Sequence, residues 1–329
     1  MKNSELRHDI VSGDWIIIAP GRLKRSSQFI KKPVKRKKVP KRGCPFEKIG
    51  SASNHEPILV LKKGNDWKVQ ILENKYPALA QINHGFDVKK MGLYETGNGF
   101  GHHDLIITRD HNKNFPDLSK DDQLLLLESL RDRYLMILDD PYIEYVSIFQ
   151  NFGPKAGASV YHPHYQMLSL PVLPADITRS LNGSLSYYKK NKKCVHCAII
   201  AWELKKKYRV VYQNEFAVAV CPYFSKTPFE VRIFPKQHLP YFENTLDRDL
   251  EGIADVLKKA LLALRKNLFD PDYNLFIHSA PLKEKSKHSH YHWHIEILPK
   301  VTTWGGFELS SGVEINPIDP DEAARVLRR

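Results

Sequence analysis

Cysteine is scarce in this sequence: the 329 residues contain four, and two of them form the pair Cys194 and Cys197 in the segment CVHC. So few cysteines argue against a secreted protein that is held together by disulfides. No apolar run approaches the ~18 residues that a membrane-spanning helix needs. The first residues, MKNSELRHDIVSGDW, also lack the apolar core of a signal peptide. The sequence therefore predicts a cytoplasmic protein with no membrane segment.

Acidic residues are outnumbered, since 50 Lys and Arg against 37 Asp and Glu give a net charge of +13. A positive charge of this size can attract nucleic acid. Much of it lies in residues 22–42, RLKRSSQFIKKPVKRKKVPKR. This segment has few aromatic side chains on which bases could stack, and it matches no known nucleic-acid-binding motif. We therefore do not expect nucleic acid to be the main partner.

The chain contains an internal repeat, in which four short segments recur in the same order. In the first half they are CPFE (44–47), NKYPAL (74–79), HDLIITRDH (103–111) and HPHYQML (162–168). In the second half they are CVHC (194–197), NEFAVA (214–219), FEVRIFPKQH (229–238) and HWHIEIL (292–298). A long amphipathic stretch, capped at Ser119 in the first copy, separates the third and fourth segments of each half.

This pattern predicts an α+β fold with two tandem domains, residues 1–185 and 186–329, joined near residues 180–190. Each domain would consist of a mixed, mostly antiparallel sheet with packed helices.

Superposing the two halves aligns two sets of metal-binding residue types. It pairs Cys44 with Cys194, Glu47 with Cys197, His111 with His238, and His162 with His292. The second set, with two thiolates and two imidazoles, suits tetrahedral Zn²⁺, with iron as an alternative. The simpler interpretation is a reduced cysteine pair beside unrelated histidines. In the first set Glu47 can replace a thiolate on zinc, or the metal has been lost and Glu47 pairs with a nearby lysine.

The segment YHPHYQ places His162, His164 and Gln166 on one face of a predicted strand. His162 is the proposed metal ligand, which leaves His164 free, as His294 is in the second half. Gln166 can donate hydrogen bonds to an oxyanion, whereas Glu296 of the second half would repel a phosphate. The small residues of NFGPKAGAS (151–159) could cradle phosphates with their backbone amides. These features favour His164 as a nucleophile that attacks an α-phosphorus and forms a covalent nucleotidyl-histidine.

The side chain of Gln166 cannot deprotonate water, so the intermediate would wait for a phosphorylated acceptor. Group transfer is therefore favoured over hydrolysis. A hydrolase would be expected to have a histidine where Gln166 lies.

Together these residues resemble the galactose-1-phosphate uridylyltransferase family of the histidine-triad superfamily. The resemblance rests on LRHDIVSGDWIIIAPGRLKR (6–25), FQNFGPKAGASVYHPHYQ (149–166), PFEVRIFPKQH (228–238) and GGFELSSGVEINPIDPDEAARVLR (305–328). It implies two histidine-triad-like domains. It also implies double-displacement transfer of a nucleoside monophosphate between a nucleotide sugar and a hexose 1-phosphate, with uridylyl transfer as the first expectation.

The resemblance also assigns residues to the substrates. It implies that Gln166 and Ser159 contact the α-phosphate, and that Asn74 and Asn151 contact the nucleotide. Gly157 would belong to the same binding site. Arg22 and Arg25 would bind phosphates across the interface of a homodimer, and Glu308 would face the sugar hydroxyls. Arg25 and Glu308 also have simpler interpretations, as a solvated charge and a surface pair.

Two departures from the family pattern leave the substrate open. Glu47 replaces a cysteine, and the tail GVEIN lacks the Gln-Arg pair of the galactose enzymes. That tail is similar to the ADP-glucose phosphorylase branch, which would use phosphate as acceptor. The nucleobase and the acceptor therefore stay open. A nucleotide hydrolase and a zinc-bearing nucleic-acid-binding protein are the other two classes considered.

Overall fold

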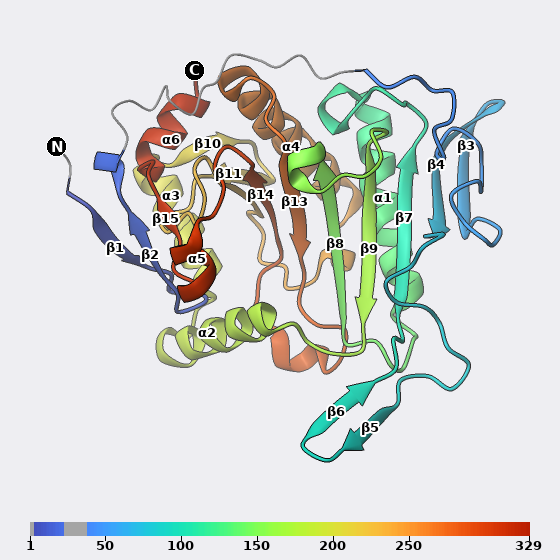
Figure 1. The fold of residues 1–329 in the computed structure, drawn as a ribbon. Coiled ribbons are helices and arrows are strands. Elements are labelled where there is room, and N and C mark those ends of the chain that lie inside the picture. The colour runs from blue at the N-terminus through green and yellow to red at the C-terminus, as the bar shows by residue number, and fades with distance from the viewer. Residues whose placement is uncertain (1–2, 23–37) are drawn as a thin grey trace.

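The main feature of the structure is one sheet of ten strands (Figure 1). The computed structural model describes residues 3–22 and 38–329. The order across the sheet is β10-β11-β12-β14-β13-β8-β9-β7-β4-β3, and every neighbouring pair is antiparallel. The bounds of these strands are β3 Leu59–Lys63, β4 Asp66–Glu73, β7 His102–Thr108, β8 Tyr145–Phe152, β9 His164–Leu170, β10 Val210–Gln213, β11 Ala217–Val220, β12 Val231–Pro235, β13 Tyr273–His278 and β14 His294–Pro299.

The sheet consists of two halves with the same internal order. β3-β4-β7-β9-β8 from the first half of the chain correspond to β10-β11-β12-β14-β13 from the second. The halves join where β8 pairs with β13, with Phe149 opposite Phe276. The α+β class with mostly antiparallel strands is thus confirmed.

The segment expected to join the two domains is helical. It belongs to α2 (Ala175–Asn191), a continuous helix that buries Ile177 and Leu181 one turn apart. The division between residues 185 and 186 therefore falls inside a helix and stays a prediction.

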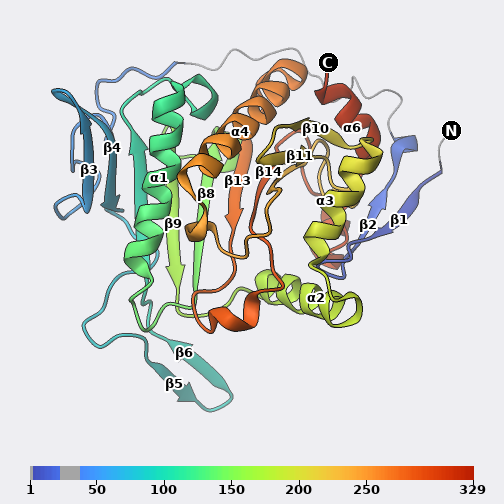
Figure 2. The same cartoon turned by 180° about the vertical axis from the view of Figure 1, so that it is seen from behind.

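Two long helices, α1 (Lys120–Ile137) and α4 (Asp247–Leu268), cover one face of the sheet, as Figure 2 shows. Ser119 caps α1 as expected, because its side chain accepts a hydrogen bond from the backbone N–H of Asp122. Each helix buries apolar residues spaced three or four apart, which are Leu126, Leu130, Tyr134 and Ile137 in α1 and Leu250, Ile253, Leu257, Leu261 and Leu264 in α4. Full burial of a leucine or isoleucine contributes about 1.5–3 kcal/mol, so these contacts fix both helices on the sheet.

Alternation along β9 decides which side chains face the helices. Tyr165 and Met167 pack into the core beneath the helices. Because successive strand residues point to opposite faces, His164 and Gln166 lie on the other face of the sheet.

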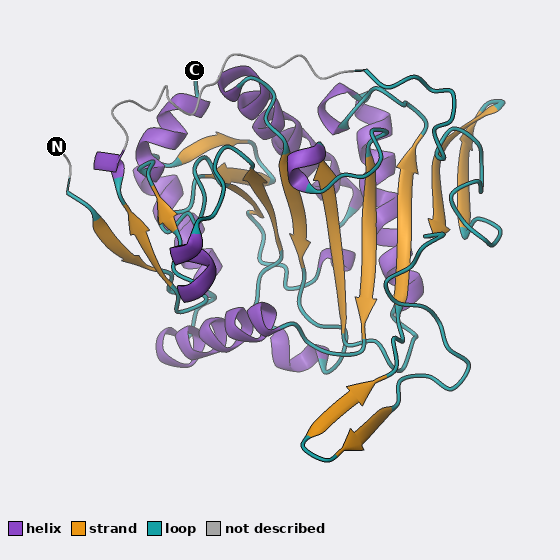
Figure 3. Cartoon of the chain, viewed as in Figure 1, coloured by secondary structure: helices purple, strands orange, loops and turns teal. Residues whose placement is uncertain are grey.

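Smaller elements lie around the large sheet (Figure 3). A three-stranded sheet has the order β1-β2-β15, and a hairpin of β5 and β6 projects from the first half. The bounds are β1 Glu5–His8, β2 Trp15–Ile18, β5 Val88–Met91, β6 Tyr94–Gly97, β15 Ile315–Asn316, α3 Val195–Lys206, α5 Gly306–Ser311 and α6 Pro320–Leu327. Within the described ranges, none of the helices is both long and apolar enough to cross a membrane.

Candidate functional site

His164 is the first residue of β9, and its side chain is only 6% exposed. Its Nδ1 lies 2.9 Å from the backbone carbonyl oxygen of His162. A carbonyl oxygen only accepts, so Nδ1 carries the hydrogen and Nε2 keeps its lone pair. The ring of Phe46 packs edge-on against the imidazole, with 4.9 Å between ring centroids. Burial lowers the pKa of His164, which favours the neutral, nucleophilic form of the ring.

Gln166 follows on the same face, and its side chain is held by a histidine of the neighbouring strand. Its Oε1 lies 3.0 Å from Nε2 of His103 in β7. His103 is not among the site residues predicted from the sequence. Its place in the segment HDLIITRDH could have indicated it, because a strand that pairs with β9 brings the side chains of one of its faces close to Gln166. The register confirms this position, because Leu105 pairs with Gln166 and His103 with Leu168.

The end of β8 and the loop that leads to β9 contain residues predicted to bind the nucleotide and its phosphates. Asn151, near the end of β8, and Ser159 both line a cavity of about 990 Å³ that reaches Pro163, the residue before His164. Gly157 has a φ of +89°, a left-handed conformation that glycine adopts without steric penalty. The second half of the chain supports this loop, because Asn274 of β13 donates to Asn151 Oδ1 and to the carbonyl oxygen of Ala156, each at 2.8 Å.

Asn74 also lies near Gln166, because its Nδ2 is 3.2 Å from Nε2 of His103. The remaining predicted substrate residues are Glu308, Arg22 and Arg25. Glu308 lies in α5, where its side chain accepts from the backbone N–H of Gly305. In Figure 1, α5 lies beside the small sheet, and strands of the second half separate it from β9. Arg22 is exposed after β2, and Arg25 lies outside the described residues.

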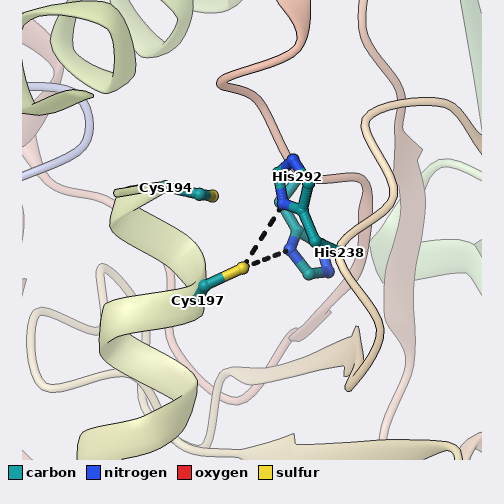
Figure 4. Close-up of side chains that lie close together, drawn as sticks. All are labelled: Cys194, Cys197, His238 and His292. Carbon is teal, nitrogen blue, oxygen red and sulfur yellow. Dashed lines mark hydrogen bonds between the residues drawn. The ribbon is translucent and has the colours of Figure 1, made fainter. Parts of the chain in front are cut away.

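The predicted second-half metal ligands lie together (Figure 4). Their ligand atoms lie within 4.8 Å of one another, and the residues are Cys194, Cys197, His238 and His292. Sγ of Cys197 is 3.3 Å from Nδ1 of His238 and 3.5 Å from Nδ1 of His292. The Nε2 atoms of the two histidines donate to the carbonyl oxygens of Ser289 and Pro235, at 2.8 and 3.0 Å.

These outer hydrogen bonds leave each Nδ1 lone pair facing the sulfurs, which is how metal-binding histidines are commonly oriented. The pKa of Cys194 is lowered, first by a hydrogen bond from Cys197 and then by the two imidazoles. A thiolate with two oriented imidazoles and a second sulfur fits a tetrahedral ion, so this cluster could hold a metal such as zinc.

The first-half cluster has the same construction. Its members, Cys44, Glu47, His111 and His162, also have ligand atoms within 4.8 Å of one another. Nε2 of His111 donates to Val39 at 2.8 Å and Nε2 of His162 to Thr108 at 2.7 Å, both to backbone carbonyl oxygens. Each Nδ1 again faces the cluster.

Glu47 contacts an arginine with one oxygen and two histidines with the other, so its cationic partner is Arg109 where the sequence suggested a lysine. Its Oε2 accepts from Arg109 at 3.0 Å. Its Oε1 lies 3.0 Å from Nδ1 of His111 and 3.6 Å from Nδ1 of His162. Oε1 and the Nδ1 of His111 are both buried and lack a hydrogen-bond partner among the described residues. Two unsatisfied ligand atoms that face one another fit a cation between them, so this cluster could also hold a metal.

The corresponding place in the second half is filled differently. Arg232 lies opposite Glu296, just as Leu105 lies opposite Gln166 in the first half. Its Nε is 3.3 Å from Glu296 and 2.9 Å from Glu230. A third group of possible ligands, which sequence analysis did not name, consists of His278, His294 and Glu296. Glu296 is thus already paired with Arg232. The second half therefore has a cluster of charged side chains at the place where the first half has the amide of Gln166.

Comparison with known proteins gives the family. Residues 1–174 match the model of the galactose-1-phosphate uridyl transferase N-terminal domain, and residues 181–317 match that of the C-terminal domain. The chain therefore belongs to the galactose-1-phosphate uridyl transferase family and is a nucleotidyltransferase, as the motifs in its sequence indicated.

Individual relatives cover nearly the whole chain. ADP-glucose phosphorylase of Arabidopsis thaliana is 34% identical over 332 residues, which span 99% of this chain and 93% of that protein. Galactose-1-phosphate uridylyltransferase of Thermotoga maritima is 28% identical over 333 residues, which span 98% of each chain. A crystal structure of the Arabidopsis thaliana ADP-glucose phosphorylase with bound ADP-glucose aligns with a TM-score of 0.83, at 32% identity and 99% coverage of both chains.

Proposed function

We propose that this enzyme transfers AMP from ADP-glucose to inorganic phosphate, through a covalent adenylyl-histidine at His164. The 34% identity to an ADP-glucose phosphorylase along almost the whole chain carries the choice of donor. This is the second of the two transfer reactions that the sequence suggested. The first, uridylyl exchange with a hexose 1-phosphate, is supported by the lower identity of 28% to the Thermotoga maritima enzyme.

The reaction proceeds in two balanced steps. The Nε2 lone pair of His164 attacks the α-phosphorus, the bond from that phosphorus to the bridging oxygen breaks, and glucose 1-phosphate leaves. An oxygen of inorganic phosphate then attacks the same phosphorus, the P–N bond breaks, and ADP forms. The hydrogen bond from Nδ1 to the carbonyl oxygen of His162, at 2.9 Å, keeps Nε2 as the attacking atom in each cycle.

Negative charge develops on the α-phosphoryl oxygens during the reaction, and hydrogen-bond donors are needed to stabilise it. We assign this role to the amide of Gln166, the hydroxyl of Ser159 and backbone amides near Gly157, with Asn74 and Asn151 on the nucleotide. Loss of one such donor typically lowers kcat by about 10²–10³-fold. None of these groups is a base for water, which favours phosphate over water as acceptor.

We infer that both Cys/His clusters hold zinc rather than iron. Bound zinc would supply structural cross-links, since each set closes with four protein ligands. The first cluster would anchor His162 and so the start of β9, which carries His164. The second would fix α3 and the start of β14.

We further propose a homodimer in which Arg22, Arg25 and Glu308 of one copy complete the pocket of the other. The position of α5 away from β9 in the same chain supports this arrangement (Figure 1). Mixing of His164→Ala and Glu308→Ala chains tests it, because a mixed dimer has one intact site. Recovery of activity on mixing is expected, and no recovery in a dimer that demonstrably exchanges subunits would contradict the proposal.

Intact-protein mass spectrometry without acceptor tests the donor and the nucleophile together. After incubation with ADP-glucose, UDP-glucose or UDP-galactose in separate samples, we expect a gain of one AMP from ADP-glucose alone. The gain should be absent in His164→Ala, and phosphate should discharge it. A UMP adduct discharged by hexose 1-phosphate would establish the uridylyl reaction instead. Release of free monophosphate without adduct would establish a hydrolase.

A further inference from the structure

The side-chain amide of Gln166 has two possible orientations, and only one of them suits a phosphate. With its NH₂ group toward the substrate it donates to a phosphoryl oxygen, and with its carbonyl oxygen toward the substrate it repels that oxygen. The two orientations have nearly the same shape, so packing alone cannot select between them. A directional hydrogen bond is needed.

His103 supplies that direction through a chain of two hydrogen bonds. The backbone N–H of Ala78 lies 3.0 Å from Nδ1 of His103, so Nδ1 must be the acceptor. The ring hydrogen is therefore on Nε2, and Nε2 can only donate. Nε2 lies 3.0 Å from Oε1 of Gln166, which accepts the hydrogen. The NH₂ group of Gln166 is then left for the substrate.

The amide of Asn74 is oriented separately, and it makes no hydrogen bond to His103 in this assignment. Its Oδ1 accepts from the backbone N–H of Tyr76 at 3.1 Å, so its Nδ2 is the atom near His103, 3.2 Å from Nε2. Because that Nε2 already carries a hydrogen, the amide hydrogens of Asn74 are not taken up there. They remain donors for the nucleotide.

We propose that His103 is a positioning residue, which fixes the amide of Gln166 with its NH₂ group toward the α-phosphate. This inference rests on the proposed function, which places the α-phosphate beside Gln166. The second half provides a contrast, because the strand position equivalent to His103 is Glu230, two residues before Arg232. Glu230 is an acceptor, and it accepts from Arg232 at 2.9 Å.

Substitutions at position 103 test the direction of the hydrogen bond. Glutamine reaches about as far as the imidazole Nε2 and can donate, so His103→Gln should form the adenylyl adduct at close to the wild-type rate. Glutamate has the same shape but only accepts, so His103→Glu should reverse the amide of Gln166. We expect its single-turnover rate to fall on the order of 10²-fold, which matches the loss of one oxyanion donor. His103→Ala should lose about twofold to tenfold, since a free amide still samples the productive orientation.

The double variants separate positioning from charge repulsion. In a Gln166→Ala background no amide remains to be oriented, so His103→Glu should cause no further loss beyond about twofold. The effect should fall on the rate of adduct formation rather than on donor binding, because the phosphoryl charge grows in the transition state. Zinc content and melting temperature of each variant show whether the fold is kept.

Two outcomes would overturn the proposal: equal rates for the Gln and Glu variants, or an undiminished effect of His103→Glu in the Gln166→Ala background. The proposed function fails separately, if the wild-type enzyme forms no adduct with any nucleotide sugar.

Discussion

The structure predicts that a residue of the second half controls substrate binding in the first. Asn274 on β13 is 9% exposed. Its Nδ2 donates to Asn151 Oδ1 and to the carbonyl oxygen of Ala156, each at 2.8 Å. Both acceptors belong to the segment from Asn151 to Ser159, which we propose binds the nucleotide and its phosphates. In Asn274→Ala both hydrogen bonds disappear, and this segment loses its connection to the second half.

The expected magnitude follows from the number of hydrogen bonds. Each is worth about 0.5–1.5 kcal/mol net, so the substitution should lower the free energy of unfolding by about 1–3 kcal/mol. If the same free energy holds the segment in its binding conformation, donor binding weakens by up to about 10²-fold, at 1.4 kcal/mol for each factor of ten.

A matched control is available in Asn267, whose Nδ2 also donates to two backbone carbonyl oxygens, those of Ala263 at 2.9 Å and Leu327 at 3.3 Å. These bonds lie at the end of α4. We expect both alanine variants to melt at lower temperature, whereas only Asn274→Ala should raise the KM for the nucleotide sugar. An unchanged KM in Asn274→Ala, or an equal rise in Asn267→Ala, would refute the reasoning.

Three further predictions concern the proposed nucleophile and the two candidate metal-binding clusters. Burial lowers the pKa of His164, so its neutral form should persist as the pH falls past 6.5, the ordinary imidazole value. The rate of adduct formation, measured by rapid quench, should therefore stay constant as the pH falls through 6.5. A pH–rate profile with its midpoint at or above 6.5 would contradict this prediction. Cys197→Ala should remove one equivalent of zinc and lower the melting temperature, as measured by elemental analysis and calorimetry, and unchanged zinc content would exclude the second cluster as a metal site. Glu47→Gln should release metal from the first cluster more readily on titration with a chelator, and equal release would show that Glu47 serves Arg109 alone.

Local patterns in the sequence predicted the elements that depend on local interactions. Helix α1 follows from apolar spacing and from the Ser119 cap, both of which lie within one segment. The members of each possible metal site are far apart in sequence, but the internal repeat still identified them, because each half of the chain constrains the interpretation of the other. The order of the repeated segments alone pairs His111 and His162 with His238 and His292. In the structure, the ligand atoms of each of the two clusters lie within 4.8 Å of one another.

Features that depend on the register between strands could not be predicted in this way. His103 reaches Gln166 because β7 and β9 are neighbours with Leu105 opposite Gln166, a diagonal contact that no spacing within one strand encodes. The environment of Glu47 is similar, because the structure directs its two oxygens to Arg109 and to His111 at once. The polar segment expected to be a linker is helical because Ile177 and Leu181 are buried on one side of α2.

The duplication also explains why the two halves need not both be catalytic. Both have a cluster of possible metal ligands and a histidine at the start of a corresponding strand, β9 or β14, but the second half has Arg232 and Glu296 where the first has Leu105 and Gln166. Arg232 is buried and pairs with both Glu230 and Glu296. Removing one partner of such a buried pair destabilises a protein by about 3–5 kcal/mol, so the ions cannot readily separate to admit a phosphate. The second half instead contributes Asn274, which holds Asn151 and Ala156 in the segment that we propose binds the nucleotide and its phosphates, so its proposed role is to support a site formed by the first half.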